Sequence, residues 1–250
     1  MKMIIVQLSD LHVGSQFLQE KFETLVEEVN QLKPDVIVVT GDLTNEGLMK
    51  EYEKSKELLS RFETKKIISV SGNHDYRNTG YLLFKKYFPF ENVNMLNENV
   101  VLVTIGTARP DRNEGEVGYR QNLWLERTMK KYKDKVKIVA MHHHLVAIPD
   151  TGSDQLTVVD AGDVLRTILD TGVDLVLCGH KHRPWVWNFG KLMVVNAGTA
   201  TSERVRGLFE NTYNIITISG RDVKVDLKIV GGKRTLIDNI VTNYSQFGDE

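Results

Sequence analysis

The sequence predicts an α/β fold, and three of its features support this prediction. Short runs rich in Val and Ile, of the length of buried strands, alternate with longer stretches in which apolar residues return at helical spacing. No segment rich in Pro, Gly or Ser divides the 250 residues, so we expect a single domain over residues 1–250. The 41% hydrophobic and 26% charged residues are typical of a folded globular chain. We therefore expect sheets covered by helices around a substantial core.

Seven apolar runs predict the strands, because continuous Val- and Ile-rich runs are typical of strands buried on both faces. They cover residues 3–8, 36–39, 67–70, 100–105, 136–140, 173–177 and 192–195. The amphipathic stretches predict helices over 17–32, 52–62, 123–132 and 159–171.

The C-terminal part departs from this alternation. Residues 213–218 and 223–229 flank the turn sequence Ser-Gly-Arg-Asp, which predicts a β-hairpin within about 211–230. We expect this hairpin to complete a second sheet together with 192–195. In the remaining tail, 231–250, we expect a short helix around 235–244, and its role cannot be read from the sequence.

Charge and cysteine content limit the partners and the compartment. The 32 basic and 33 acidic residues give a formal charge of −1, so no overall field favours stable binding of nucleic acid or of an anionic membrane. No run approaches the roughly 20 apolar residues of a membrane span, and polar Gln7 comes too early for a signal peptide. Cys178, the single cysteine, lies in an apolar run and fits a packing role in a reducing compartment. We expect a cytoplasmic protein; the oligomeric state is not readable.

Polar residues follow five of the predicted strands. These segments are Ser9-Asp10-Leu11-His12, Thr40-Gly41-Asp42, Ser71-Gly72-Asn73-His74-Asp75, Met141-His142-His143-His144 and Gly179-His180-Lys181-His182. Ligands of α/β proteins gather at the carboxyl ends of the strands, so we expect these segments to meet at one sheet edge. All seven histidines of the chain lie in them, which favours a role as metal ligands or proton carriers.

The donors in these segments predict a site for two metal ions. Oxygen and nitrogen ligands are available from Asp10, His12, Asp42, Asn73, His142, His180 and His182. A structural zinc ion typically takes four ligands, so seven fit two ions that share one ligand better. Mixed oxygen and imidazole ligands suit Mn, Fe, Zn, Co and Ni; we expect Mn or Fe.

The five motifs together resemble those of the calcineurin-like metallophosphoesterases. They are D-x-H at Asp10, G-D at Gly41, G-N-H-D at Gly72, a His after an apolar run at His142, and G-H-x-H at Gly179, in the family's order. The resemblance implies a four-layer αββα sandwich of two mixed β-sheets flanked by helices. It also implies that Asp10, His12 and His182 hold the first ion. The second ion would be held by Asn73, His142 and His180, and Asp42 would bridge the two.

This arrangement predicts hydrolysis of a phosphate ester. Two divalent cations exceed the charge of two carboxylates by about two, which leaves a site attractive to an anion. Metal binding lowers the pKa of water towards roughly 7, so a hydroxide bridging the ions is the expected nucleophile. In the family pattern His74 is not a ligand, and we expect it to contact the phosphate or to protonate the leaving oxygen. We expect Asp75 to orient His74, with a simple turn role as the alternative.

The finer roles are less defined. The roles of His143 and His144 stay open, and Arg204 and Arg206 are expected to be exposed charges unless they reach a substrate phosphate. Asn45 stands where purple acid phosphatases have a ligand tyrosine, and the Asp-Arg-Gly of protein phosphatases is missing. The chain is most similar to the branch of class III cyclic-nucleotide phosphodiesterases and glycerophosphodiesterases. A small phosphodiester is therefore the expected substrate, with monoesters as further candidates.

Two alternatives remain. A repair-type DNA nuclease would share the Asp10 and Gly72 motifs but should need a basic track for the phosphates, and the densest basic run, 130–137, is more simply the solvated end of a helix. A non-catalytic scaffold with the same fold would have lost ligands or His74, whereas all are present here.

Overall fold

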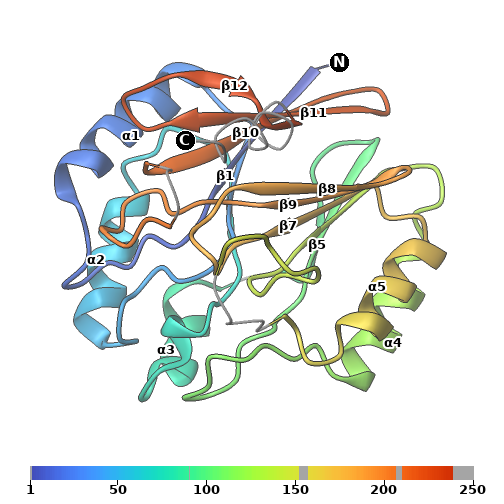
Figure 1. Ribbon diagram of the computed structural model, residues 1–250, viewed down its shortest axis with the longest axis horizontal. Coiled ribbons are helices and arrows are strands. Elements are labelled where there is room, and N and C mark those ends of the chain that lie inside the picture. The colour runs from blue at the N-terminus through green and yellow to red at the C-terminus, as the bar shows by residue number, and fades with distance from the viewer. Residues whose placement is uncertain (1, 90, 152–156, 207–209, 239–250) are drawn as a thin grey trace.

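Two mixed β-sheets, packed face to face, form the centre of the molecule, and helices cover their outer faces (Figure 1). The computed structural model describes residues 2–89, 91–151, 157–206 and 210–238. In Figure 1, α1 and α2 lie outside one sheet, and α4 and α5 lie outside the other. The four-layer αββα sandwich is therefore confirmed.

The first sheet combines the N-terminal strands with the C-terminal hairpin, in the order β12-β11-β10-β1-β2-β3. Its strands are β1 (Lys2–Leu8), β2 (Val36–Val39), β3 (Ile67–Ser69), β10 (Thr212–Ser219), β11 (Asp222–Ile229) and β12 (Arg234–Leu236). β1, β2 and β3 are parallel, whereas β10 pairs antiparallel with β1.

The second sheet has the order β4-β5-β6-β7-β9-β8. Its strands are β4 (Val93–Met95), β5 (Val100–Thr104), β6 (Val136–Ala140), β7 (Leu175–Cys178), β8 (Trp185–Phe189) and β9 (Leu192–Asn196). The four central strands are parallel, and the two edge strands, β4 and β8, are antiparallel to their neighbours.

The helices follow the predicted amphipathic stretches, with one addition. They are α1 (Gln19–Leu32), α2 (Met49–Leu59), α3 (Gly80–Tyr87), α4 (Tyr119–Met129) and α5 (Ala161–Asp170), and a short 3₁₀ turn, η1, spans His74–Tyr76. In α1 the buried residues Phe22, Leu25, Val26 and Val29 recur at helical spacing and face the first sheet.

Three hydrophobic clusters fill the three spaces between the four layers. In β2, Val36 and Val38 pack between the two sheets, while Ile37 and Val39 pack towards α1 and α2. A third cluster lies between the second sheet and helices α4 and α5. Alternate residues of a strand point to opposite faces, so a strand buried on both faces must be apolar throughout. This explains why the strands were visible as continuous Val and Ile runs.

Two sequence expectations for the C-terminal part need correction. The hairpin forms as β10 and β11, but it extends the first sheet beside β1 and does not join residues 192–195, which form β9 of the second sheet. The expected helix 235–244 begins later than predicted, because Arg234–Leu236 pair with β11 as β12 and helical conformation begins at Ile237. Residues 239–244 of that helix lie outside the described residues.

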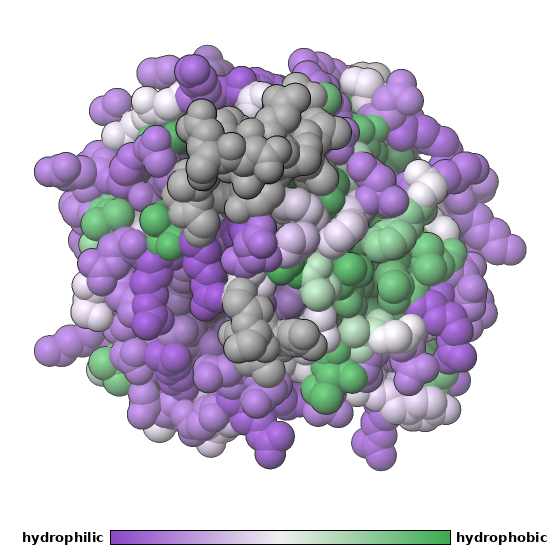
Figure 2. Space-filling view, viewed as in Figure 1, coloured by the Kyte–Doolittle hydropathy of each residue, from purple (hydrophilic) through white to green (hydrophobic). Residues whose placement is uncertain are grey.

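The surface shown in Figure 2 is mainly hydrophilic, with hydrophobic residues gathered on the side of β8 and α5. Within the described residues, every helix is too short or too polar to cross a bilayer.

Candidate metal centre

The five polar segments of the sequence meet at the carboxyl ends of β1, β2, β3, β6 and β7. These strands belong to both sheets, so the expected single sheet edge is in fact a rim that the two sheets share. Six of the seven ligand candidates are buried, and His180 is partly exposed. The structure therefore brings all seven candidates together from a span of more than 170 positions.

Backbone conformation at the site is unusual. Five of the candidates have positive φ angles, although none is glycine: Asp10 (54°), His12 (50°), Asp42 (52°), His180 (77°) and His182 (53°). Such conformations cost L-residues on the order of 1 kcal/mol or more and cluster at functional sites. Main-chain hydrogen bonds hold two of them, from Asp10 N–H to the Gly41 carbonyl (3.0 Å) and from His12 N–H to the Asp42 carbonyl (2.9 Å).

The first group of ligand atoms comes from two segments that are 170 positions apart in the chain. The Nε2 atoms of His12 and His182 are 2.9 Å apart. Asp10 Oδ1 lies 3.3 Å from His182 Nε2 and 3.9 Å from His12 Nε2. The other Asp10 oxygen, Oδ2, accepts hydrogen bonds from the Ser9 hydroxyl (2.6 Å) and from His180 N–H (3.0 Å). Oδ1 also accepts from His180 N–H (3.2 Å) and is the oxygen that lies towards the two imidazoles.

The second group is centred on the side-chain oxygen of Asn73. Asn73 Oδ1 lies 3.1 Å from His142 Nε2 and 3.0 Å from His180 Nδ1. The segment that contains Asn73 lies very close to the end of β2. A Cβ at Gly72 would collide with the Asp42 carboxylate. This contact gives a physical reason for glycine in the Gly-Asn-His-Asp motif.

Asp42 lies between the two groups. Its Oδ1 accepts a hydrogen bond from His74 N–H (2.8 Å). Its Oδ2 lies 3.7 Å from His12 Nε2 of the first group and 3.4 Å from His142 Nε2 of the second. A single carboxylate oxygen therefore faces both groups.

The ligand atoms of these residues are arranged as expected around bound cations, and the same arrangement is unfavourable without a positive charge. His142 donates Nδ1–H to the Thr40 carbonyl (2.7 Å), and His182 donates Nδ1–H to the Arg204 carbonyl (2.5 Å). In neutral imidazoles this leaves the Nε2 lone pairs pointing at other acceptors, so a positive charge is needed between them. Burial alone would lower the pKa of His142, but the Asp42 carboxylate beside it raises this pKa to about 9. The same field that favours a proton on His142 would favour a metal ion.

His74 lies at the site without belonging to either group. Its Nδ1–H donates to the Asn45 carbonyl (2.7 Å), and its ring stands edge-on to His12 at 4.5 Å between centroids. We expected Asp75 to hold this nitrogen, but the Asp75 carboxylate instead accepts bonds from Gly72 N–H and from the N–H and hydroxyl of Thr44, each 2.9 Å long. Asp75 therefore ties the second and third polar segments together: its bond to Gly72 is the local contact of the turn alternative, whereas its two bonds to Thr44 span 31 positions and were not expected.

Burial raises the pKa of the Asp75 carboxyl group to about 7, and the nearby Asp42 carboxylate adds to the effect. The three hydrogen bonds act in the opposite direction, because they stabilise the ionised form. The carboxyl group is fully buried and does not line the cavity that opens at the site.

A cavity of about 370 Å³ opens over the two groups. Its lining comprises Asp42, Asn73, His74, His180 and His182 together with Arg77, Asn113, Lys181, Arg204, Val205 and Arg206. Its volume falls within the range of small-molecule sites. Arg204 and Arg206 are exposed, as expected, and yet both line this cavity. The basic residues among this lining, of which Arg77 is paired with Glu46 (2.8 Å), favour an anionic ligand.

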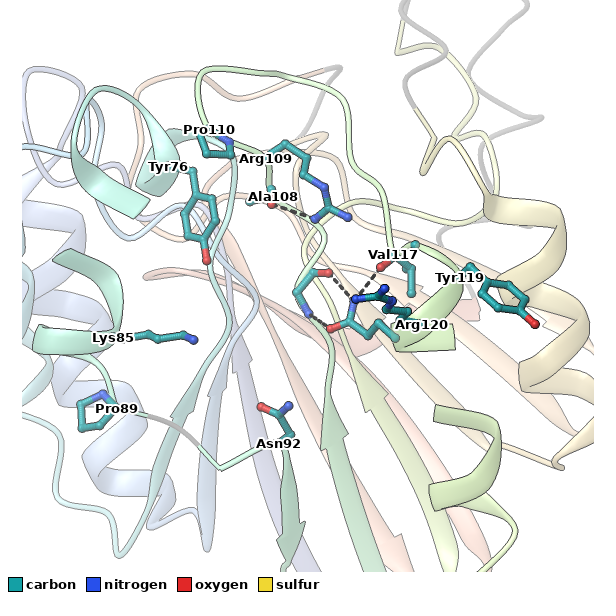
Figure 3. Close-up of a pocket in the computed structure, with 13 residues that line it drawn as sticks. Tyr76, Lys85, Pro89, Asn92, Ala108, Arg109, Pro110, Val117, Tyr119 and Arg120 are labelled. Atoms are coloured by element: carbon teal, nitrogen blue, oxygen red, sulfur yellow. Dashed lines mark hydrogen bonds between the residues drawn. The ribbon is translucent and has the colours of Figure 1, made fainter. Parts of the chain in front are cut away.

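A larger cavity, of about 1000 Å³, contains none of the ligand candidates. Figure 3 shows it beside α3, with Lys85 extending into the open space above Asn92 and with Ala108 and Arg109 on its upper rim. The segment that includes residues 106–110 lines this cavity, and Asn113, a few residues further on, lines the metal-site cavity.

Several residues at the site were missed by sequence reasoning. Asn113, Arg77 and Lys181 line the cavity, and Ser9 and Thr40 hold ligand side chains. Ser9, Thr40 and Lys181 stand next to motif residues, so their positions were a usable signal. Asn113 lies in a long loop between β5 and α4 with no motif around it, and only the fold reveals it.

The chain matches known proteins in sequence and in fold. The family model of the calcineurin-like phosphoesterases matches residues 3–184. A probable glycerophosphodiester phosphodiesterase (GpdQ) of Arcobacter nitrofigilis is 27% identical over 218 residues, 80% of each chain. The cAMP/cGMP dual specificity phosphodiesterase MT0825 of Mycobacterium tuberculosis is 28% identical over 198 residues, 72% of this chain and 61% of that protein. A dimetal phosphatase of Danio rerio has the same fold, with a TM-score of 0.72 at 9% identity over 94% of this chain and 98% of that one.

Proposed function

Because the chain belongs to the calcineurin-like phosphoesterases, we propose that it hydrolyses small phosphodiesters at a centre of two metal ions. The observation that carries this proposal is the position of Asp42 Oδ2, which faces His12 of one ligand group and His142 of the other. An oxygen in that position is suited to bridge two cations. Asp10, His12 and His182 would hold the first ion, and Asn73, His142 and His180 the second.

The bound ions would supply a nucleophile at neutral pH and would neutralise the charge of the phosphate. The protein's own contribution is to fix the ligand atoms through the partners of their other atoms. Thr40 and the Arg204 carbonyl hold the two imidazoles, and His74 N–H holds Oδ1 of Asp42. These bonds leave the ligand atoms pointing into the site and limit their movement during turnover.

His74 is the proposed proton donor to the leaving oxygen. Its Nδ1–H is held by the Asn45 carbonyl, so Nε2 is the atom that can exchange a proton at the cavity. When the ring is protonated, the Nε2 proton passes to the departing alkoxide oxygen as its bond to phosphorus breaks. The ring returns to the neutral form with Nδ1 still bonded to Asn45.

The substrate proposed here is a cyclic nucleotide or a phosphodiester of similar size. The cavity of about 370 Å³ suits such a molecule, and the basic residues of its lining suit the negative charge of the phosphate. Relatives named as a cAMP/cGMP phosphodiesterase and as a glycerophosphodiester phosphodiesterase support a diester. Mn or Fe is the proposed metal, since either suits ligands of mixed oxygen and imidazole type.

The proposal is tested by metal analysis followed by a substrate panel. Purified protein should contain close to two equivalents of metal, and Mn²⁺ should restore activity after chelation. The panel comprises bis-p-nitrophenyl phosphate, p-nitrophenyl phosphate, cyclic AMP, cyclic GMP, glycerophosphocholine and single-stranded DNA. We expect the small diesters to be hydrolysed fastest. Preferential cleavage of DNA would favour the nuclease alternative, and a metal-loaded protein that hydrolyses none of them would favour the scaffold.

A further inference from the structure

His143, the middle residue of the His-His-His segment, is bonded through both ring nitrogens to the loop between β5 and α4. Its Nε2 lies 3.0 Å from the Asn113 carbonyl oxygen, and because a carbonyl only accepts, Nε2 carries the proton. Its Nδ1 lies 2.7 Å from the Thr107 hydroxyl, which donates to it. The same hydroxyl accepts a 3.3 Å bond from His143 N–H.

This bonding pattern prevents His143 from acting as a metal ligand. The ring is close to His142 and His180, with centroid distances of 4.9 Å and 4.5 Å, and the three residues could be mistaken for a ligand triad. However, one ring nitrogen of His143 bears a hydrogen, and the lone pair of the other is used by Thr107.

The loop lies directly against the His143 ring. A Cβ at Gly115 would collide with ring atoms of His143, so only glycine allows this approach. The ring is therefore enclosed by Gly115 on the loop side and by His142 and His180 on the metal side.

The loop in turn reaches a ligand candidate of the second ion. Asn113 Oδ1 accepts a hydrogen bond from Asn73 Nδ2 at 3.4 Å. This contact determines which way the Asn73 amide faces, because with Nδ2 turned to Asn113 the oxygen is turned to His142 and His180. A rotated amide would place NH₂ among the ligand atoms, where it could not bind a metal ion.

We propose that His143 and Asn113 are positioning residues for the second metal ion, acting as one unit in which His143 fixes the Asn113 backbone and Asn113 fixes the Asn73 amide. We call Thr107, Asn113 and His143 the loop clamp. The proposal rests on the two-metal centre proposed above, and it assigns a role to His143 and to a loop outside the family motifs. Only the second ion depends on the clamp, because the first group is held by Ser9 and Arg204 instead.

The test compares Asn113→Ala and His143→Phe with the wild type and with Glu114→Ala. Glu114 is exposed and lies between Asn113 and Gly115, so it controls for any change in this loop. The full-length proteins are stripped of metal and titrated with Mn²⁺ by calorimetry, and the Mn²⁺ EPR spectrum reports whether two ions are coupled. Thermal unfolding of the metal-free proteins shows whether each variant folds.

Loss of a residue that orients a ligand typically weakens metal binding 10- to 100-fold. We expect this weakening for the second Mn²⁺ in both variants, with the first Mn²⁺ and Glu114→Ala unchanged. The double variant should be no weaker than the worse single variant, because the two residues act in series. Asn113→Ala removes only an exposed side chain, so it provides the test even if His143→Phe fails to fold.

Two outcomes would overturn the proposal. Wild-type affinity for the second ion in Asn113→Ala would show that Asn73 needs no clamp. Equal weakening of both ions would show a general disturbance of the site. A wild-type protein that binds fewer than two ions would instead refute the proposed two-metal centre, and the clamp with it.

Discussion

Asp42→Asn is the substitution with the most clearly defined expected effect. The new amide must keep an oxygen at the Oδ1 position, because His74 N–H donates to that atom at 2.8 Å. The NH₂ group then takes the Oδ2 position, 3.4 to 3.7 Å from the imidazoles of both groups, where it cannot ligate. One substitution therefore removes the shared ligand and its negative charge with almost no change in volume.

The loss can be estimated from the charge alone. Two unit charges about 4 Å apart interact by about 4 kcal/mol at an effective dielectric constant of 20, and a divalent ion interacts with the carboxylate more strongly, so we expect at least about a 10³-fold loss of affinity for each ion. The assay is metal content after dialysis, together with hydrolysis of bis-p-nitrophenyl phosphate. Asp35→Asn, the same change just before β2 at the opposite end of the strand, is the matched control. An Asp42→Asn protein that keeps two ions and more than about a tenth of the activity would refute the bridging role.

Two further substitutions test residues of the site, and one labelling experiment tests the buried cysteine. His74→Ala should keep both ions, because the bond to Asp42 comes from the backbone, but should lower kcat by about 10²- to 10⁴-fold; loss of metal would contradict this. Arg204→Ala should raise KM for anionic diesters with little loss of bound metal, since the carbonyl of Arg204 and not its side chain holds His182. An unchanged KM would show that the Arg204 side chain is a solvated surface charge that does not contact the substrate. Cys178 is fully buried, and burial raises the pKa of its thiol to about 12, so a thiol reagent at pH 8 should label it only after denaturation.

The sequence was sufficient to predict the fold class because most strands are buried on both faces. The sequence was insufficient to predict elements that are buried on one face only or that are short. β8 contains Asn188 and an exposed Phe189 at a sheet edge, so no apolar run marks it. In α3 the apolar residues 81–84 are consecutive, which hides the helical period. The choice of β1 as the partner of β10 joins residues more than 200 positions apart, and no local pattern encodes such a choice.

The ligand candidates were predictable because each follows a strand whose end the sequence marks. Their partners were less predictable, since a carbonyl group can hold a side chain whatever its residue type. The expected Asp75–His74 contact illustrates this: the Asn45 carbonyl holds His74, and Asp75 bonds Thr44 and Gly72. Asn113 was missed for the related reason that its position depends on His143 and the loop, which meet only in the folded chain.

The backbone hydrogen bonds at the site indicate that the fold itself contributes to positioning the candidate ligands. Asp10 and His12 adopt left-handed conformations that L-residues disfavour, and the bonds that hold them run from β1 to the end of β2 through main-chain atoms. A similar bond, from Gly179 N–H to the His142 carbonyl (2.9 Å), joins the segments of the second sheet. None of these bonds involves a metal ligand atom. We therefore expect the proposed centre to differ from small zinc domains, in which the metal organises the fold. Chelation should remove only the stabilisation that comes from ion binding and should leave the arrangement of the five segments in place.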